Sequence, residues 1–175
     1  MTDPDDAFFD TASAEELKNY VFSHMEQLRH CSDDDLGAML RAAARLVEFG
    51  DFPTATAAIQ GTVSFAARDS ATERIGTNLA LNAANKAYKA GDLATALAVA
   101  RIAVGYPPEW SEIRLAAVDL VMQLAKDALD AGNQALALDA ARMASIHAPK
   151  GTDRLRRAIA LNLQVAQQAA KSGKL

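Results

Sequence analysis

The sequence predicts an all-α fold, a right-handed α-solenoid of antiparallel helix pairs with about eight helices. The first observation is a period of 41 residues that separates Gly50, Gly91 and Gly132, with Gly173 one period further on. The second is that Asp or Asn directly follows each of the first three glycines. The third is the absence of alternating strand patterns bounded by turns. A fixed period in this range is the signature of a helical repeat array.

The glycines predict a tight turn between two helices in each period. A helix commonly ends with a residue in the left-handed conformation, which glycine adopts without a side-chain clash. The Asp or Asn that follows can cap the next helix by accepting hydrogen bonds from its free backbone N–H groups. Small residues recur in the same register, which lets the paired helices approach closely. They are Ala43, Ala84, Ala125 and Ala166 before the turns, and Ala55, Ala96, Ala137, Thr62, Ala103 and Ala144 after them.

The pattern of helix, Gly-Asp, helix and closing proline (Pro108 and Pro149) resembles the tetratricopeptide repeat, over roughly residues 32–175. That resemblance implies a superhelix whose concave side binds a peptide or protein. The family repeat is about 34 residues long, so each repeat here carries about two extra helical turns. The family's bulky residues are mostly missing. Met39, Ala80, Val121 and Asn162 stand where the family has Trp, and Leu46, Ala87, Ala128 and Ala169 stand where it has Tyr.

The N-terminal part is expected to form a flexible acidic segment followed by a capping helix. Residues 1–9 are acidic, and we expect them to be mobile. Phe8 and Phe9 are the exception, since they could dock on the first helices or engage another chain. The capping helix is expected over residues 13–30, because Ser13 and Glu16 have the spacing of a capping box.

Three repeats and a terminal helix are expected to follow, within one domain that spans residues 10–175. The repeats span residues 32–67, 70–106 and 108–147, and the terminal helix spans residues 152–172. Ser70 and Glu73 have the spacing of another capping box, and Gly76 predicts a kink or a later start at Thr77. The terminal helix has no following helix to pack on, so one of its faces should be solvated or covered by another subunit.

Composition places the chain among soluble proteins, and we expect a cytoplasmic location. The chain has 175 residues, 50% of them hydrophobic, and no apolar run long enough to span a membrane. Its N-terminus lacks the basic and apolar regions of a signal peptide. A single cysteine, Cys31, excludes an intramolecular disulfide, which fits a reducing compartment. The net charge of −4 is uneven, since residues 140–175 carry seven basic side chains and one acidic side chain.

No pattern in the sequence indicates catalysis, a metal or a cofactor. His24, His30 and Cys31 do not have the spacing of a zinc motif, so we expect no bound metal. A phosphate-binding loop and a nucleophile elbow are both absent. A basic cluster of Lys150, Arg154, Arg156 and Arg157 could contact RNA, but the acidic chain with few aromatic residues disfavours nucleic acid. The sequence therefore favours a protein that is not an enzyme.

The strongest functional pattern is a polar stripe on the first helix of the second repeat. Asn78, Asn82, Asn85 and Lys89 fall at helical spacing on one face, with Tyr88 beside them. Asparagine is a poor helix former, so three on one face indicate another use. Amide side chains both donate and accept hydrogen bonds, as a peptide backbone requires. Carrying the register to the other repeats adds Arg41, Gln123, Lys126, Gln164 and Gln167 to the predicted peptide-binding groove.

Two classes of function remain open from the sequence. One is a protein–protein interaction module, an adaptor or chaperone-like scaffold that grips a peptide or protein segment in this groove. Lys89, Lys126 and Lys171 could engage acidic side chains or a C-terminal carboxylate. The other is a self-assembling structural subunit that forms homo-oligomers through its end helices.

Overall fold

The structure, a computed structural model, describes residues 6–171, which contain nine α-helices, one short 3₁₀-helix and no strand. The all-α prediction is therefore confirmed for the described residues. The expected position Gly173, residue 172 of the terminal helix and most of the expected mobile segment lie outside them. Within residues 6–171, none of the helices combines the length and the apolar character that crossing a bilayer requires.

The described residues form two compact units, 6–83 and 84–171, with the boundary inside helix α5. The first unit contains α1 (Asp6–Thr11), α2 (Ala14–Met25), η1 (Leu28–His30), α3 (Asp33–Glu48), α4 (Phe52–Phe65) and the first part of α5 (Ala71–Lys89). The second unit contains the rest of α5, α6 (Leu93–Gly105), α7 (Glu112–Asp130), α8 (Gln134–His147) and α9 (Asp153–Lys171).

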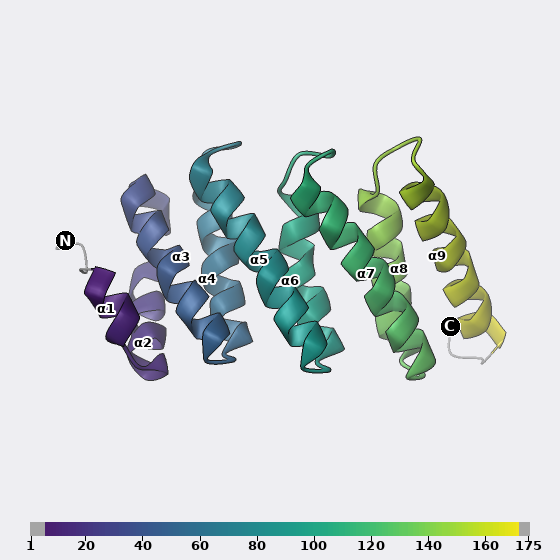
Figure 1. Ribbon diagram of the computed structural model, residues 1–175, viewed down its shortest axis with the longest axis horizontal. Coiled ribbons are helices and arrows are strands. Elements are labelled where there is room, and N and C mark those ends of the chain that lie inside the picture. The colour runs from purple at the N-terminus through teal and green to yellow at the C-terminus, as the bar shows by residue number, and fades with distance from the viewer. Residues whose placement is uncertain (1–5, 172–175) are drawn as a thin grey trace. The chain divides into compact units, whose positions relative to one another are not determined.

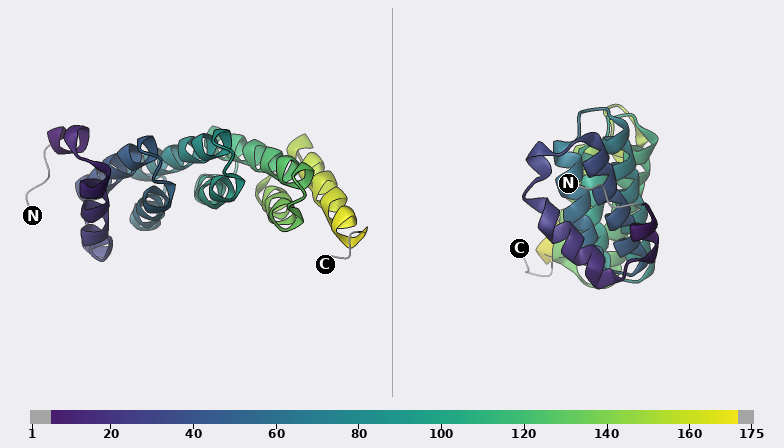
Figure 2. Two further views of the ribbon diagram at one scale, coloured as in Figure 1. Left: turned by 90° about the horizontal axis from the view of Figure 1, so that it is seen from below. Right: turned by 90° about the vertical axis from the view of Figure 1, so that its left-hand side faces the viewer.

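Each unit is built from two layers of helices, and sequential helices run antiparallel (Figure 1). In the first unit, α3 packs on α4 and α1, while α2 contacts α4 in the other layer. In the second unit, α7 and α9 lie in one layer, and α6 and α8 lie in the other (Figure 2). We refer to α3, α5, α7 and α9 as the first helices, because each opens a predicted repeat.

The three expected glycine turns have the same geometry. Gly50, Gly91 and Gly132 have φ angles of 80°, 82° and 74°, in the left-handed region. The N–H after each glycine donates to a carbonyl five residues earlier, as in Asp92 to Ala87 at 3.0 Å. The same residue then caps the next helix with its side chain, as the Asp92 carboxylate does for the N–H of Thr95. This turn chemistry, predicted from Gly-Asp and Gly-Asn, is confirmed at all three positions.

Burial follows the 41-residue register. The small residues expected at helix contacts are buried except Ala166 on α9, which is half-buried. The buried ones include Ala43, Ala84, Ala125, Ala55, Ala96 and Ala137. The positions where the resemblance would place Tyr are also buried, from Leu46 to Ala169. Alanine at these sites brings helix backbones close together, so the core depends on close helix approach rather than on bulky side chains.

The helix boundaries differ from the expectation in three places. The capping helix ends at Met25 and gives way to η1. Residues 6–11 form a helix, α1. It is held in place because Phe9 is buried, with 2% of its surface exposed, and its ring centroid lies 5.4 Å from that of Tyr20. The third repeat begins at Ser111, whose hydroxyl caps α7, rather than at Pro108. Phe8 and Phe9 dock on α2, where their ring centroids lie 6.0 Å and 5.4 Å from that of Tyr20.

Gly76 does not delay the start of α5, which begins at Ala71. The glycine is buried where α5 crosses α4, and a Cβ at this position would collide with Val63. Gly76 therefore permits a close helix contact. Ala117 and Ala158, which occupy the same register on α7 and α9, are fully buried as well.

Candidate functional site

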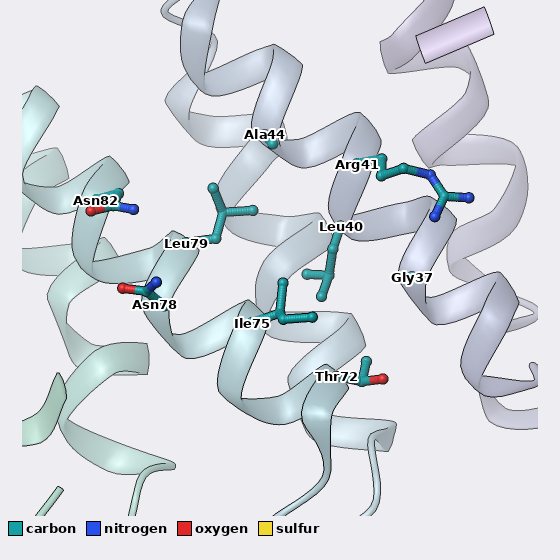
Figure 3. Close-up of a pocket in the computed structure, with 9 residues that line it drawn as sticks. All are labelled: Gly37, Leu40, Arg41, Ala44, Thr72, Ile75, Asn78, Leu79 and Asn82. Carbon is teal, nitrogen blue, oxygen red and sulfur yellow. The ribbon is translucent and has the colours of Figure 1, made fainter. Parts of the chain in front are cut away.

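A hollow of about 390 Å³ lies between α3 and α5 in the first unit. We call it the α3/α5 hollow. Figure 3 shows Leu40, Ile75 and Leu79 directed toward one another between the two helices. Asn78 and Asn82 lie along the α5 side of this apolar floor. The full lining consists of Gly37, Leu40, Arg41, Ala44, Thr72, Ile75, Asn78, Leu79 and Asn82.

A second hollow, of about 460 Å³, lies between α7 and α9 in the second unit. We call it the α7/α9 hollow. Its lining is Asp119, Met122, Gln123, Lys126, Arg157, Ala160, Leu161 and Gln164. Five of these eight side chains are charged or carry an amide, and three of them, Gln123, Lys126 and Gln164, belong to the groove that the sequence predicts.

The two hollows occupy the same position of the predicted repeat. Every residue of the α7/α9 hollow lies 82 residues, or two periods of 41, after a residue of the α3/α5 hollow. Leu161 thus corresponds to Leu79, and Gln164 corresponds to Asn82. Each hollow lies entirely within one unit, so the correspondence between their residues does not depend on contacts between the units. The register therefore creates a recess wherever two first helices lie side by side within a unit.

The chemistry of the two hollows differs. Ile75, which is 59% exposed, contributes an open apolar surface to the α3/α5 hollow. Its counterpart in the α7/α9 hollow is Arg157, and the counterpart of Ala44 is Lys126. The first hollow can therefore hold an apolar side chain, whereas the second offers charged and amide groups.

Arg41 lines the α3/α5 hollow mainly through the stem of its side chain. Its guanidinium lies over the ring of Phe9, 5.2 Å from the ring centroid. In Figure 3 the same group points to the side of α3 away from Ile75. A cation over an aromatic face is attracted by the ring quadrupole. Arg41 therefore links α3 to α1 in addition to forming one edge of the hollow.

The charges of the α7/α9 hollow are arranged around Asp119. Nε and Nη2 of Arg154 donate to its carboxylate at 3.0 to 3.1 Å. Nη2 of Arg157 lies 3.9 Å from the same carboxylate. The pKa of Arg154 is raised, first by this hydrogen bonding and then by the charge of Asp119. Lys126 adds a further cation, so the hollow is positively charged on balance.

Two predicted groove residues form hydrogen bonds inside the protein. The hydroxyl of Tyr88 donates to Oδ2 of Asp127 at 2.6 Å, and Nε2 of Gln123 donates to Oδ1 at 2.8 Å. The pKa of Tyr88 is raised, chiefly by the hydrogen bond to this carboxylate. Asn85 is half-buried and also interacts with the rest of the protein. These three side chains stabilise the second unit.

The remaining predicted groove residues have exposed side chains. They are Asn78, Asn82, Lys89, Lys126, Gln164 and Gln167. The structure brings Asn78 and Asn82 together with Arg41 in one hollow, and Gln123, Lys126 and Gln164 together in the other. Lys89 and Gln167 line neither hollow.

The sequence analysis missed the apolar half of the α3/α5 hollow. Leu40, Ile75 and Leu79 are apolar, so they fall outside a prediction based on polar side chains along one stripe. A usable signal existed, since Ile75 and Leu79 precede Asn78 and Asn82 by three residues on the same helix. An apolar residue next to an amide stripe is a reasonable sign of a binding surface.

The three residues considered for metal binding lie in ordinary environments. Nδ1 of His24 is 2.7 Å from the carbonyl of Tyr20, and its ring stacks on the Tyr20 ring. The thiol of Cys31 donates to the carbonyl of Gln27. Burial raises the pKa of this thiol, so its reactive thiolate form is disfavoured. Across residues 6–171, His, Cys, Asp and Glu side chains form no group of three that could hold a metal ion.

No protein-family model matches the chain, and comparisons with curated proteins and with solved structures also find no match. The function of the two hollows must therefore be inferred from their own residues.

Proposed function

We propose that the chain is a non-enzymatic protein–protein interaction module, an adaptor or chaperone-like scaffold that holds an extended peptide segment against its first helices. One observation carries the proposal, namely the recurrence of a solvent-open hollow at the same position of the repeat, 82 residues apart. The stability of the fold does not require an exposed isoleucine, Ile75, beside the two exposed asparagines Asn78 and Asn82.

The proposal includes the architecture expected from the sequence, a right-handed α-solenoid similar to tetratricopeptide repeats. Support comes from the identical turns at Gly50, Gly91 and Gly132 and from burial that follows the 41-residue register. A cytoplasmic location is part of the same proposal. It rests on the single cysteine, Cys31, which a reducing compartment leaves as a thiol.

The α3/α5 hollow suits an extended peptide with one large apolar side chain. That side chain would rest on Leu40, Ile75 and Leu79 and bury apolar surface, which is worth about 1.5 to 3 kcal/mol for a side chain the size of leucine. The amides of Asn78 and Asn82 can donate to and accept from the peptide backbone on either side. Backbone recognition of this kind demands little of the peptide sequence beyond the apolar anchor.

The test begins with a random peptide library displayed on phage and selected against the purified chain. The selected peptides should share one large apolar residue. Fluorescence anisotropy then measures the affinity of one selected peptide for two variants, Asn82→Ala and Ile75→Asp. Loss of a hydrogen bond at Asn82 should weaken binding roughly fivefold, which corresponds to about 1 kcal/mol. Ile75→Asp should weaken binding more, because it places a charge on the apolar floor.

Asn19→Ala is the matched control, since Asn19 is also an exposed asparagine on a helix but lies on α2 and lines neither hollow. Its affinity for the peptide should equal that of the unmodified chain. Circular dichroism should show that all variants fold, because these side chains are exposed and alanine favours a helix. If Asn82→Ala and Asn19→Ala bind the selected peptides equally well, the α3/α5 hollow is not the peptide site.

A further inference from the structure

Helix α9 exposes apolar side chains at positions that are buried on α7. Ile159 and Leu163 are 45% and 59% exposed. Val118 and Met122, one period earlier on α7, are buried, because α8 and α9 both pack on α7. Helix α9 is the last described helix, and its equivalent face has no such cover within residues 6–171. Its sequence thus has the pattern of a helix that is covered on two sides, although within residues 6–171 only one side is covered.

The uncovered face of α9 has an apolar centre and basic ends. Arg156, Ile159, Leu163, Ala166 and Ala170 follow one another at alternating steps of three and four residues, which places them on one face. We call this set the α9 stripe. Lys171 follows Ala170 at the C-terminal end, about 100° further around the helix, so its long side chain flanks the stripe rather than continuing it. The helix contains four basic residues and one acidic residue, Asp153, so an acidic surface is its natural complement.

Helix α2 of the same chain presents that complement. Glu15, Asn19, Phe22 and Glu26 lie at steps of four, three and four residues and are all exposed, so they form the α2 stripe. Phe22 at its centre is 63% exposed. The equivalent residues of α4 and α6, Val63 and Val104, are buried. An exposed phenylalanine between two glutamates therefore matches the α9 stripe in both apolar character and charge.

We propose that the α9 stripe of one copy docks on the α2 stripe of a second copy, with the two helices antiparallel. Phe22 then packs between Ile159 and Leu163. Glu26 faces Arg156 at one end, and Glu15 faces Lys171 at the other. The carboxylates are about 16 Å apart along α2 and the cations about 22 Å apart along α9, at about 1.5 Å per residue. The side chains of Lys171 and Arg156 are long enough to span the difference between these two separations.

A contact of α9 with α9 is disfavoured, because antiparallel pairing would bring Arg156 of each copy toward Lys171 of the other. Like charges placed opposite each other repel. The α9–α2 contact joins two different surfaces, so it adds copies head to tail rather than closing as a symmetric pair. The inference is independent of peptide binding, because neither stripe lines a hollow.

Sedimentation equilibrium of the full chain, over a wide range of concentration and at low and high salt, tests the contact. The weight-average mass should rise above the 18.6 kDa of one chain as concentration increases. High salt should weaken the association by screening the glutamates from the basic groups. A mass of one chain at every concentration and salt would overturn the proposal.

Substitutions identify the surfaces. Leu163→Glu should return the mass to that of one chain, whereas Ile146→Glu should not, since Ile146 is 65% exposed but lies on α8 outside both stripes. Equal effects of the two substitutions would contradict the docking site. Circular dichroism confirms that each variant is folded.

A charge reversal tests the partner surface without adding a charge to an apolar position. Arg156→Glu and Glu26→Arg should each weaken association severalfold, and the chain carrying both should regain it. If Glu26→Arg has no effect while Leu163→Glu still dissociates the complex, α9 docks on something other than α2 and the proposal fails.

Discussion

The hydroxyl of Tyr88 on α5 donates a hydrogen bond of 2.6 Å to Asp127 on α7, a residue 39 positions along the chain. The same carboxylate accepts a bond of 2.8 Å from Gln123. Asp127 thereby ties two helices of the second unit together through a half-buried polar group. A residue that the sequence assigns to ligand binding has a structural bond of its own.

Tyr88→Phe should lower the free energy of unfolding by about 1 kcal/mol, the typical net value of one hydrogen bond. Urea denaturation measures the change. Asp127→Ala should cost more, since it removes the bonds of both Tyr88 and Gln123. The double variant should lose less free energy of unfolding than the sum of the two single losses, because both substitutions remove the same hydrogen bond. Additive effects would mean that the bond contributes nothing to stability.

Gly91→Val should lower the melting temperature clearly. Gly91 has a φ of 82°, a conformation that a β-branched residue resists, although space around the position is open. Gly105→Val is the control, because Gly105 also has open space around it but its φ lies outside the left-handed region. Differential scanning calorimetry compares the two. An equal effect of both substitutions would remove the conformational explanation of the turn.

Gly76→Ala should destabilise the first unit, even though alanine is the better helix former by about 1 kcal/mol. The new methyl group would collide with Val63, and overpacking of this kind typically costs about 1 to 3 kcal/mol. Adding Val63→Ala should recover part of the loss. Gly37→Ala, where the nearest atom is 3.7 Å away, should stabilise instead. Thermal unfolding of the three variants distinguishes collision from helix propensity.

Thr62→Val should raise the free energy of unfolding by about 1 kcal/mol. The Thr62 side chain is fully buried, and its hydroxyl finds no hydrogen-bond partner among the described residues. An unsatisfied buried hydroxyl costs about 1 to 3 kcal/mol, and valine keeps the shape while removing it. The equivalent residues, Ala103 and Ala144, are apolar and fully buried. A loss of stability in urea denaturation would indicate that the hydroxyl has a partner.

Stability should fall as the pH drops below about 6.5, the ordinary pKa of histidine. Burial, followed by the charge of Arg114, lowers the pKa of His147 in the folded protein. Between the folded and unfolded values the unfolded chain binds more protons, so acid favours unfolding. Urea denaturation between about pH 5 and pH 8 measures this slope. His147→Gln should flatten it, and an unchanged slope would assign the effect to other groups.

Local features of the fold were predictable from the sequence, whereas long-range contacts were not. The caps at Ser13 and Asp92 depend on residues within one turn of helix, so spacing alone identifies them. Helix α1 forms because Phe9 packs on Tyr20 and under Arg41, contacts that no local pattern encodes. Gly76 falls between these cases. Its role in close packing could have been read from Ala117 and Ala158 in the same register.

The candidate site was predicted only in part, for the same reason. Helical spacing correctly places Asn78 and Asn82 together on exposed surface. It does not reveal that Tyr88 is bonded to Asp127, because that contact depends on how α5 and α7 pack. The bond between Gln123 and Asp127 lies within α7 at a spacing of four residues, so it was predictable from the sequence.

The contrast between the two ends of the chain has a consequence for local opening. The rings of Phe9 and Tyr20 hold α1 on α2, whereas the face of α9 that carries Ile159 and Leu163 has no cover within residues 6–171. Backbone amides of α9 should therefore exchange their hydrogens with solvent sooner than those of α7, since fraying of a half-covered helix breaks fewer contacts. Such opening would make α9 the first segment that a protease cleaves. A bound partner would therefore protect α9 from cleavage more than any other part of the chain.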